Sequence, residues 1–338
     1  MPPEALAEGH GAGWPGLRDA IASHLATTRG VRCDGSQVFV TTSVRAGIGL
    51  VARALKPAPA SAWVEDPGYF GFKDALRSVG IEPRLVPVDA DGLDVDAAVR
   101  RHPDARLAIV TPTAHFPTGV EMSAQRRSNL IAWARAAGGW ILEDNYDSEN
   151  RFEGLPAPPI ASVAPDVTIY MNSFNRTLFP ALRIAYMVLP ESLVGAVARE
   201  RSGLDGHTNV PNQIVMADFI NGGGLDEHLR RCRAAYRQRR DALLGALETD
   251  LRAFLSPHRT PGGLQVVADL ARLDERDAVE AARGAGILLT GMAQYLDSAT
   301  RPPQVVMGFA GFRPADIAKG GSGGSGPRSK PALGAHDL

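Results

Sequence analysis

Short apolar runs and amphipathic segments alternate through the first half of the chain. Val38–Thr42 is an apolar run rich in β-branched residues, and Arg45–Leu55 follows it with the spacing of a helix. Further strands are expected at Ala62–Glu65, Arg84–Val88, Leu107–Thr111, Trp140–Glu143, Thr168–Asn172 and Ile184–Val188, and further helices at Tyr69–Val79 and Ser123–Ala137. Apolar strands that alternate with helices predict an α/β fold, in which helices cover a mostly parallel central sheet.

The residues with the most distinctive chemistry follow the predicted strands. In sheets of this kind, ligands bind beyond the carboxyl ends of the strands. A strand, or the turn that ends one, precedes each of Ser43, Tyr69, the run Thr111–Gly119, Asp144 and Arg176. The pattern therefore predicts one ligand site at that edge of the sheet.

From Pro211 onward the pattern changes to long helices. Gly222–Gly224 separates a first helix from a second one over about Leu225–Leu251, which has an apolar stripe along one side. The opposite side carries Arg230, Arg231, Arg233, Arg237, Arg239 and Arg240. These arginines could bind nucleic acid, but the nearly neutral chain favours a helix surface that faces solvent or a second subunit.

These changes in pattern divide the chain into four parts. We expect an N-terminal arm and helix in residues 1–30, and a large α/β domain that carries the ligand site in residues 31–224. The long helix and a smaller C-terminal α+β subdomain follow in residues 225–319. Residues 320–338 begin with G-G-S-G-G-S-G, which is the composition of a flexible tail.

Composition and charge narrow the class of protein further. Of the 338 residues, 44% are hydrophobic and 22% are charged, and the net charge is −1, so no nucleic-acid or membrane surface is indicated. No stretch approaches the length of about eighteen apolar residues that a membrane helix needs, and no signal peptide is visible. Two cysteines, Cys33 and Cys232, offer neither a disulfide framework nor the spacing of metal ligands. We expect a cytoplasmic protein without a metal site.

A series of short motifs is more specific than these features. They are L-R-D-A-I-A from Leu17, R-G-V-R-C ending at Cys33, E-D-P-G-Y ending at Tyr69, T-P-T-A-H-F-P-T-G from Thr111, E-D-N-Y-D-S-E-N-R-F from Glu143, N-S-F-N-R-T-L-F-P-A-L-R-I-A-Y from Asn172, H-L-R-R from His228 and M-G-F-A from Met307. Over about Trp14 to Lys319, the chain resembles the aminotransferase-like domain of the MocR-type regulators of the GntR family. The resemblance implies a fold-type-I aminotransferase architecture and the cofactor pyridoxal 5′-phosphate (PLP).

The resemblance implies four contacts to the cofactor, each with a chemical reason. Asp144 matches the carboxylate beside the pyridine nitrogen, where a buried negative charge keeps the ring protonated. Tyr146 matches the partner of the phenolic oxygen of the ring, and Tyr69 matches the aromatic residue that stacks on the ring. Arg183 matches the phosphate-binding arginine, whose forked donors can engage two oxygens. The alternative for Asp144 is a carboxylate-rich surface loop, since several acidic residues crowd the same segment.

The turn at Ser43, Val44 and Arg45 is expected to complete the phosphate site. It opens a helix, where free backbone amides and the helix dipole favour an anion. MocR-type domains usually carry glycine and glutamine in this turn, so the site is altered here. The dipeptide Thr118–Gly119 flanks the ring in the family, and His115 stands where glutamine is usual. A lone histidine is more often a structural hydrogen-bonding residue than an acid or a base.

Arg176 is the main departure from the family. It occupies the position at which the lysine of the family forms a Schiff base with PLP. Transamination needs a neutral amine that attacks the aldehyde and then moves a proton. Arginine, with a pKa above about 12, stays charged and is a poor nucleophile. The chain therefore resembles a PLP domain without the covalent anchor, and Lys73, one helical turn after Tyr69, is the alternative anchor.

Three functions are open at this point. The first is a dimeric domain that binds PLP, or its amine form, without a covalent link and is catalytically impaired. The second is an active aminotransferase with an atypical catalytic residue, for which His115 is the nearest base in sequence. The third is a non-catalytic sensor, or a dimer partner of a complete homologue. An amino acid or amine is the expected ligand, Arg301 is the candidate for its carboxylate, and we expect no DNA-binding module in this chain.

Overall fold

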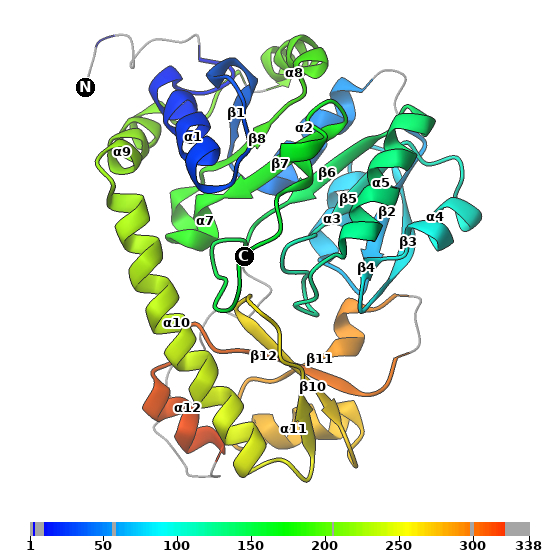
Figure 1. The fold of residues 1–338 in the computed structure, drawn as a ribbon, viewed down its shortest axis with the longest axis vertical. Helices are drawn as coiled ribbons and strands as arrows, with labels where there is room; N and C mark the ends of the chain where they lie inside the picture. Colours follow the sequence, from blue (N-terminus) through cyan, green and yellow to red (C-terminus); the bar gives the residue numbers. More distant parts are fainter. Residues whose placement is uncertain (1–2, 4–9, 56–58, 205, 298–300, 322–338) are drawn as a thin grey trace.

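The computed structural model describes residues 3, 10–55, 59–204, 206–297 and 301–321. Figure 1 shows a large sheet covered by helices and, at the other end of a long helix, a small sheet. The large sheet has eight strands and the small one has four. The predicted α/β class, with a mostly parallel central sheet and a smaller C-terminal α+β part, is confirmed.

The large sheet has the strand order β1-β8-β7-β6-β5-β2-β3-β4. Its strands are β1 (Val38–Thr41), β2 (Ser61–Asp66), β3 (Glu82–Asp89), β4 (Gly92–Leu93), β5 (Leu107–Val110), β6 (Trp140–Asp144), β7 (Thr168–Ser173) and β8 (Ala185–Val188). The strands from β7 to β3 pair in parallel, and the short β4 runs antiparallel to β3. β8 is antiparallel to both of its neighbours, β1 and β7, so these two strands point the same way.

Helices cover both faces of the large sheet, which agrees with the mostly apolar sequences of its strands. On one face lie α2 (Val44–Ala54), α3 (Phe70–Arg77) and α8 (Glu191–Leu204). On the other lie α1 (Pro15–Thr28), α4 (Val95–Arg101), α5 (Ala124–Ala137), α6 (Ile160–Val163) and α9 (Val210–Asn221). Alternate residues of a strand enter the two cores: in β2, Ala62 and Val64 join the first core, and Trp63 joins the second.

The C-terminal part is built around α10 (Gly224–Thr249), which runs from the large sheet to the small one (Figure 1). The small sheet is antiparallel, with the order β11-β12-β10-β9. Its elements are β9 (Leu255–Pro257), β10 (Gln265–Leu270), α11 (Glu275–Gly284), β11 (Thr290–Gly291), η4 (Met292–Tyr295), β12 (Gln304–Gly308) and α12 (Pro314–Gly321). Leu244 and Leu247 of α10 share a core with Val266 of β10 and Val305 of β12, so α10 and the small sheet pack as one unit.

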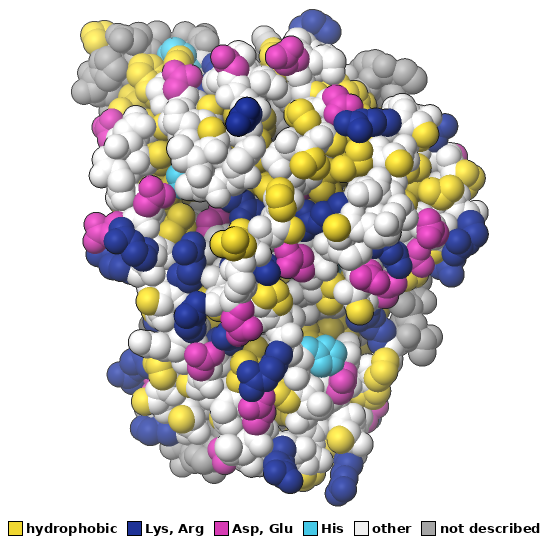
Figure 2. Space-filling view, in the orientation of Figure 1, with side chains coloured by type: hydrophobic (Ala, Val, Ile, Leu, Met, Phe, Trp, Pro, Cys, Tyr) yellow, Lys and Arg dark blue, Asp and Glu magenta, His cyan; other side chains and the backbone are white. Residues whose placement is uncertain are grey.

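The arginines of α10 do not form a uniformly solvated surface. Arg240 is buried, pairs with Glu153 at 2.8 Å, and lies 4.9 Å from the centre of the Phe152 ring. Arg237 donates a hydrogen bond to the carbonyl of Phe152, and Arg239 also donates to a backbone carbonyl. Figure 2 shows basic and acidic side chains interspersed over this face of the molecule. Part of the arginine cluster therefore fastens α10 to neighbouring segments.

The first two residues of the predicted flexible tail belong to a helix. α12 extends to Gly321, so the assignment of Gly320 and Gly321 to the tail was wrong. Glycine lowers helix propensity by about 1 kcal/mol per residue, which a packed helix end tolerates. Residues 322–338, which carry the rest of the predicted tail, lie outside the described part of the chain, as do residues 1–2 and 4–9 of the predicted N-terminal arm.

Candidate functional site

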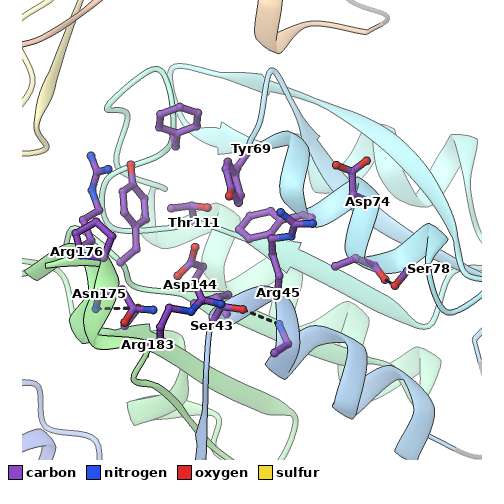
Figure 3. Close-up of a pocket in the computed structure, with 18 residues that line it drawn as sticks. Ser43, Arg45, Tyr69, Asp74, Ser78, Thr111, Asp144, Asn175, Arg176 and Arg183 are labelled. Atoms are coloured by element: carbon purple, nitrogen blue, oxygen red, sulfur yellow. Dashed lines mark hydrogen bonds between the residues drawn. The ribbon is translucent and has the colours of Figure 1, made fainter. Parts of the chain in front are cut away.

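A cavity of about 560 Å³ lies at the carboxyl ends of the parallel strands of the large sheet (Figure 3). Ser43 follows the end of β1, Thr111 follows β5, Asp144 ends β6 and Ser173 ends β7. The other lining residues belong mainly to α2, α3 and the segment that contains α7 (Phe174–Thr177) and η3 (Pro180–Leu182). The predicted position of the ligand site, beyond the strand ends, therefore coincides with a cavity.

Eight of the residues that we predicted for the cofactor site line this cavity: Ser43, Val44, Arg45, Tyr69, Asp144, Tyr146, Arg176 and Arg183. Figure 3 shows that those it labels come from different elements around one space. The alternative interpretation of Asp144, an exposed acidic loop, does not fit, because only 6% of this residue is exposed. The structure thus brings the predicted acidic, phenolic and guanidinium groups together.

Asp144 is a buried acid with one oxygen that has no partner within the described part of the chain. Its Oδ1 atom has no hydrogen-bond donor among the described residues. Burial raises the pKa of Asp144 to about 7, although a hydrogen bond from the Tyr146 backbone and the charge of Arg176 act in the opposite direction. A carboxylate in this situation gains free energy from a ligand that brings a protonated nitrogen.

Glu65, at the end of β2, is a second buried acid near the site, and the sequence had not singled it out. Burial raises the pKa of Glu65 to about 8, while the backbone N–H of Thr111, which donates to its Oε2 at 3.0 Å, lowers it. The negative charge of Asp144 also raises the pKa of Glu65. Because Thr111 lines the cavity, Glu65 fixes the backbone of a wall residue and couples electrostatically to Asp144.

Aromatic rings form one side of the site. The Phe116 ring makes edge contacts with Tyr69 and Tyr146, with ring centres 6.0 and 6.4 Å apart. It also contacts Tyr295 of η4, at 5.1 Å between centres, so the cluster joins the large and small parts of the chain. Burial raises the pKa of Tyr146 well above its usual range. Its hydroxyl group therefore stays protonated and can exchange hydrogen bonds with a ligand.

Arg176 projects from α7 beside Tyr146. Its Nε donates to Oδ1 of the fully buried Asp147 at 3.1 Å, and its guanidinium lies 5.1 Å from the centre of the Tyr146 ring. Burial lowers the pKa of Arg176, but the negative charge of Asp147 and the hydrogen bond to it, together with smaller contributions from neighbouring groups, outweigh burial, so the net shift is upward. Arg176 is therefore a permanent cation, which can donate hydrogen bonds but cannot act as a base or as an amine nucleophile.

The opposite end of the cavity suits an anion. α2 begins after Ser43, whose Oγ accepts a hydrogen bond from the N–H of Ala46 at 3.1 Å. This cap leaves the amides of Val44 and Arg45 without an acceptor within the helix. Arg183 has φ 54° and ψ 42°, in the left-handed region that residues with side chains seldom adopt. In Figure 3, Ser43, Arg45 and Arg183 lie at the same end of the cavity.

Asn175 positions this end of the site, and the sequence had not singled it out. Its Nδ2 donates to the carbonyl of Thr42 at 3.0 Å, and its Oδ1 accepts from the N–H of Ile184 at 2.7 Å. Asn175 therefore ties the end of β1 to the turn of Arg183, and it helps to hold that turn in its unusual conformation. A short amide side chain directly after a predicted strand was the available signal.

His115 does not line the cavity. Its Nδ1 lies 2.7 Å from Thr118 Oγ1, and its Nε2 lies 3.5 Å from Glu65 Oε2. Burial lowers the pKa of His115 to about 3, so the ring is neutral at physiological pH. Gly119 next to Thr118 has φ +73°, and a Cβ there would come within 2.8 Å of Thr260. Thr118 and Gly119 are therefore not part of the cavity lining, and Gly119 packs closely against Thr260 of the C-terminal part.

Two other predicted residues also lie away from the cavity wall. Lys73, the alternative covalent anchor, is buried and forms an ion pair with Asp297. Arg301, the candidate for a ligand carboxylate, donates instead to the carbonyl of Val88. Neither residue is among those that line the cavity.

The described residues contain no group of three or more His, Cys, Asp or Glu side chains arranged to hold a metal ion. Within the same residues, no helix is both long enough and apolar enough to cross a membrane.

Comparison with known proteins relates this site to a family. The family model described as aminotransferase class I and II matches residues 8–299. The chain is 34% identical over 313 residues to the "Probable rhizopine catabolism regulatory protein MocR" of Rhizobium meliloti, a match that covers 91% of this chain and 62% of that protein. It is 32% identical over 293 residues to the HTH-type pyridoxine biosynthesis transcriptional regulator PdxR of Corynebacterium glutamicum. This match covers 87% of this chain and 63% of that protein. The chain thus spans less than two thirds of the length of these relatives.

Solved structures share the architecture. Kynurenine aminotransferase of Pyrococcus horikoshii, solved in complex with PMP, matches with a TM-score of 0.84 at 23% identity, covering 95% of this chain and 81% of that one. The multiple substrate aminotransferase of Thermococcus profundus matches with a TM-score of 0.84 at 24% identity. This match covers 95% of this chain and 82% of that one. At these identities the likeness concerns the fold, and it confirms the predicted fold-type-I architecture.

Proposed function

Because the chain belongs to the aminotransferase class I and II family and is related to the MocR-type regulators, we propose that it binds PLP without a covalent bond and does not catalyse transamination. One observation carries the proposal. A single cavity combines the buried carboxylate of Asp144, whose Oδ1 has no partner among the described residues, with the guanidinium of Arg176, at the position where the resemblance implies lysine.

The residues around the cavity fit this cofactor. Asp144 would pair with the protonated pyridine nitrogen, Tyr146 would bind the phenolic oxygen, and Tyr69 would stack on the ring. Arg183 and the first turn of α2 would hold the phosphate, since a forked cation and free amides both favour an anion there. When bound, PLP supplies an electron sink for amino-acid chemistry. The chain supplies binding and orientation.

Three observations support the loss of catalysis. Arg176 is held in an ion pair with Asp147 and remains protonated, so no neutral amine stands at the lysine position. The alternative base, His115, is buried outside the cavity lining with a pKa of about 3 and is engaged by Thr118. The alternative anchor, Lys73, is engaged by Asp297. None of these three residues is therefore available to move a proton between two carbon atoms at the lysine position.

The relatives favour a sensor role for such a domain. MocR and PdxR are both named as regulatory proteins, and PdxR is named for pyridoxine biosynthesis. We propose that this chain is a cytoplasmic, homodimeric ligand sensor that takes an amino acid or an amine beside PLP. Light scattering should give the mass of a dimer at micromolar concentration, and a monomer at that concentration would contradict the dimeric part of the proposal.

Equilibrium dialysis against PLP tests the binding proposal directly. We expect saturable binding that weakens about tenfold to a hundredfold in Asp144→Asn, because the charge-assisted bond to the ring nitrogen is lost. Asp166→Asn is the matched control, since this surface acid pairs only with Arg135 among the described residues, and it should leave binding unchanged. Incubation with a panel of amino acids should leave the bound cofactor unconverted. Binding that does not saturate would refute the proposal, and conversion of the cofactor would refute its non-catalytic part.

A further inference from the structure

The cavity has guanidinium groups at two separate ends. In Figure 3, Arg183 and Arg45 lie near Ser43 at one end of the cavity, and Arg176 lies at the opposite end. Asp144 lies between the two ends. The phosphate group is expected at the end near Ser43, because the first turn of α2 begins there and the N-terminus of a helix favours an anion. The proposed function therefore leaves Arg176 facing the part of the ligand that is remote from the phosphate.

The contacts of Arg176 leave part of its donor capacity unused. Its Nε is engaged by Asp147 Oδ1, which also accepts from Asn150 Nδ2 at 3.1 Å. Within the described residues, the two Nη atoms of Arg176 have no hydrogen-bond partner, and the side chain lines the cavity. A guanidinium offers donors only, so these two atoms can be satisfied only by an acceptor.

We propose that Arg176 makes the site selective for phosphorylated pyridines that carry a carboxylate on, or next to, the 4′ carbon, and selective against those that carry an ammonium group there. The inference rests on the proposed function, since it takes the 4′ carbon to lie near the position at which the family places its lysine. A carboxylate can accept two parallel bonds from the Nη atoms. An ammonium group would bring a second set of donors and a second positive charge to the same place.

The acid closest to Arg176 does not remove this selectivity. Asp147 could attract an ammonium group, but its Oδ1 already accepts from Arg176 and Asn150. Its Oδ2 has no hydrogen-bond partner within the described residues, but it is buried with the whole side chain, and Asp147 is not among the residues that line the cavity. Tyr146, on which the guanidinium stacks, keeps its hydroxyl protonated and so adds no negative charge. The group that a ligand meets on this side is the donor face of Arg176.

Three compounds that differ only at the 4′ carbon test the inference by their dissociation constants. Pyridoxamine 5′-phosphate carries an ammonium group, PLP an aldehyde, and 4-pyridoxic acid 5′-phosphate a carboxylate. We expect affinity to rise in that order, with the carboxylate binding about tenfold to a hundredfold more tightly than the ammonium compound. A second pair, N-(5′-phosphopyridoxyl)glycine and its methylamine counterpart, shows whether a carboxylate supplied by an amino acid gives the same gain.

Two variants identify the residue responsible. Arg176→Gln should bring the affinities of the three compounds together, whereas Arg183→Gln should weaken all three and keep their order. Equal affinities in the wild-type protein would overturn the inference and leave the proposed function standing. An order that survives in Arg176→Gln would also overturn it. If no compound binds the wild-type protein, the proposed function itself fails. The three dissociation constants of the wild-type protein test the selectivity even if a variant does not fold.

Discussion

At the scale of single residues, two buried acids beside the cavity keep protons that surface acids would lose. Burial raises the pKa of Glu65 to about 8 and that of Asp144 to about 7. In the unfolded chain both groups titrate near about 4. Between these values the folded state binds more protons than the unfolded state, so the free energy of unfolding falls as the pH rises through this window.

Replacing Glu65 by glutamine should remove most of its share of this pH dependence. Between pH 6 and pH 8, the wild-type protein should lose on the order of 2 kcal/mol more unfolding free energy than Glu65→Gln. The amide oxygen of glutamine can still accept the N–H of Thr111, so the local structure is kept. Urea unfolding at the two pH values measures the difference. Glu248→Gln, a more exposed acid paired with Arg259, serves as control, and equal pH dependence in wild type and Glu65→Gln would contradict the assignment.

The sequence identified those site residues whose position depends on strand ends. Asp144 and Ser43 follow apolar runs, and parallel strands that point the same way bring their ends together. Asn175 and Glu65 escaped notice because their roles depend on hydrogen bonds to Thr42, Ile184 and Thr111 in distant segments. Arg301 was predicted to bind a ligand carboxylate without a supporting motif. It donates instead to the carbonyl of Val88, a contact between distant segments that the sequence does not reveal.

At the scale of elements, α10 shows what the periodicity of the sequence can and cannot predict. Helical spacing predicted the helix and its apolar stripe, and Leu247 of that stripe is buried as expected. The same pattern placed the arginines on one polar side. It could not separate buried from exposed members, because Arg240 is covered by Phe152 and Glu153, which lie in the segment after β6.

This difference predicts unequal effects of two matched substitutions on α10. The Arg240 side chain is 10% exposed, whereas that of Arg231 is 70% exposed and, among the residues that the structure describes, pairs only with Glu227 one turn away. Arg240→Ala should lower the free energy of unfolding by about 2 kcal/mol, through lost packing and ion pairing. Arg231→Ala should change it by less than about 0.5 kcal/mol. Chemical denaturation compares them, and equal losses would show that Arg240 does not fasten the helix.

At the scale of the whole molecule, the apolar pattern determined the fold class but not every strand direction. β8 has the same apolar character as the parallel strands of the sheet, yet it runs antiparallel between β1 and β7. An apolar run carries no information on direction, which depends on the short connection through α7 and η3. That connection also places Arg176 and Arg183 in one cavity, so the site follows from the reversal of the chain at this point.

The account as a whole depends on a cavity that binds PLP while lacking the covalent anchor. Borohydride reduction of the PLP-saturated protein, followed by the intact mass of the denatured chain, tests this most directly. We predict that the wild-type chain gains no pyridoxyl group, whereas Arg176→Lys gains one, because lysine can supply the missing amine in an otherwise suitable site. A pyridoxyl group on the wild-type chain, at Lys73 or elsewhere, would contradict the account.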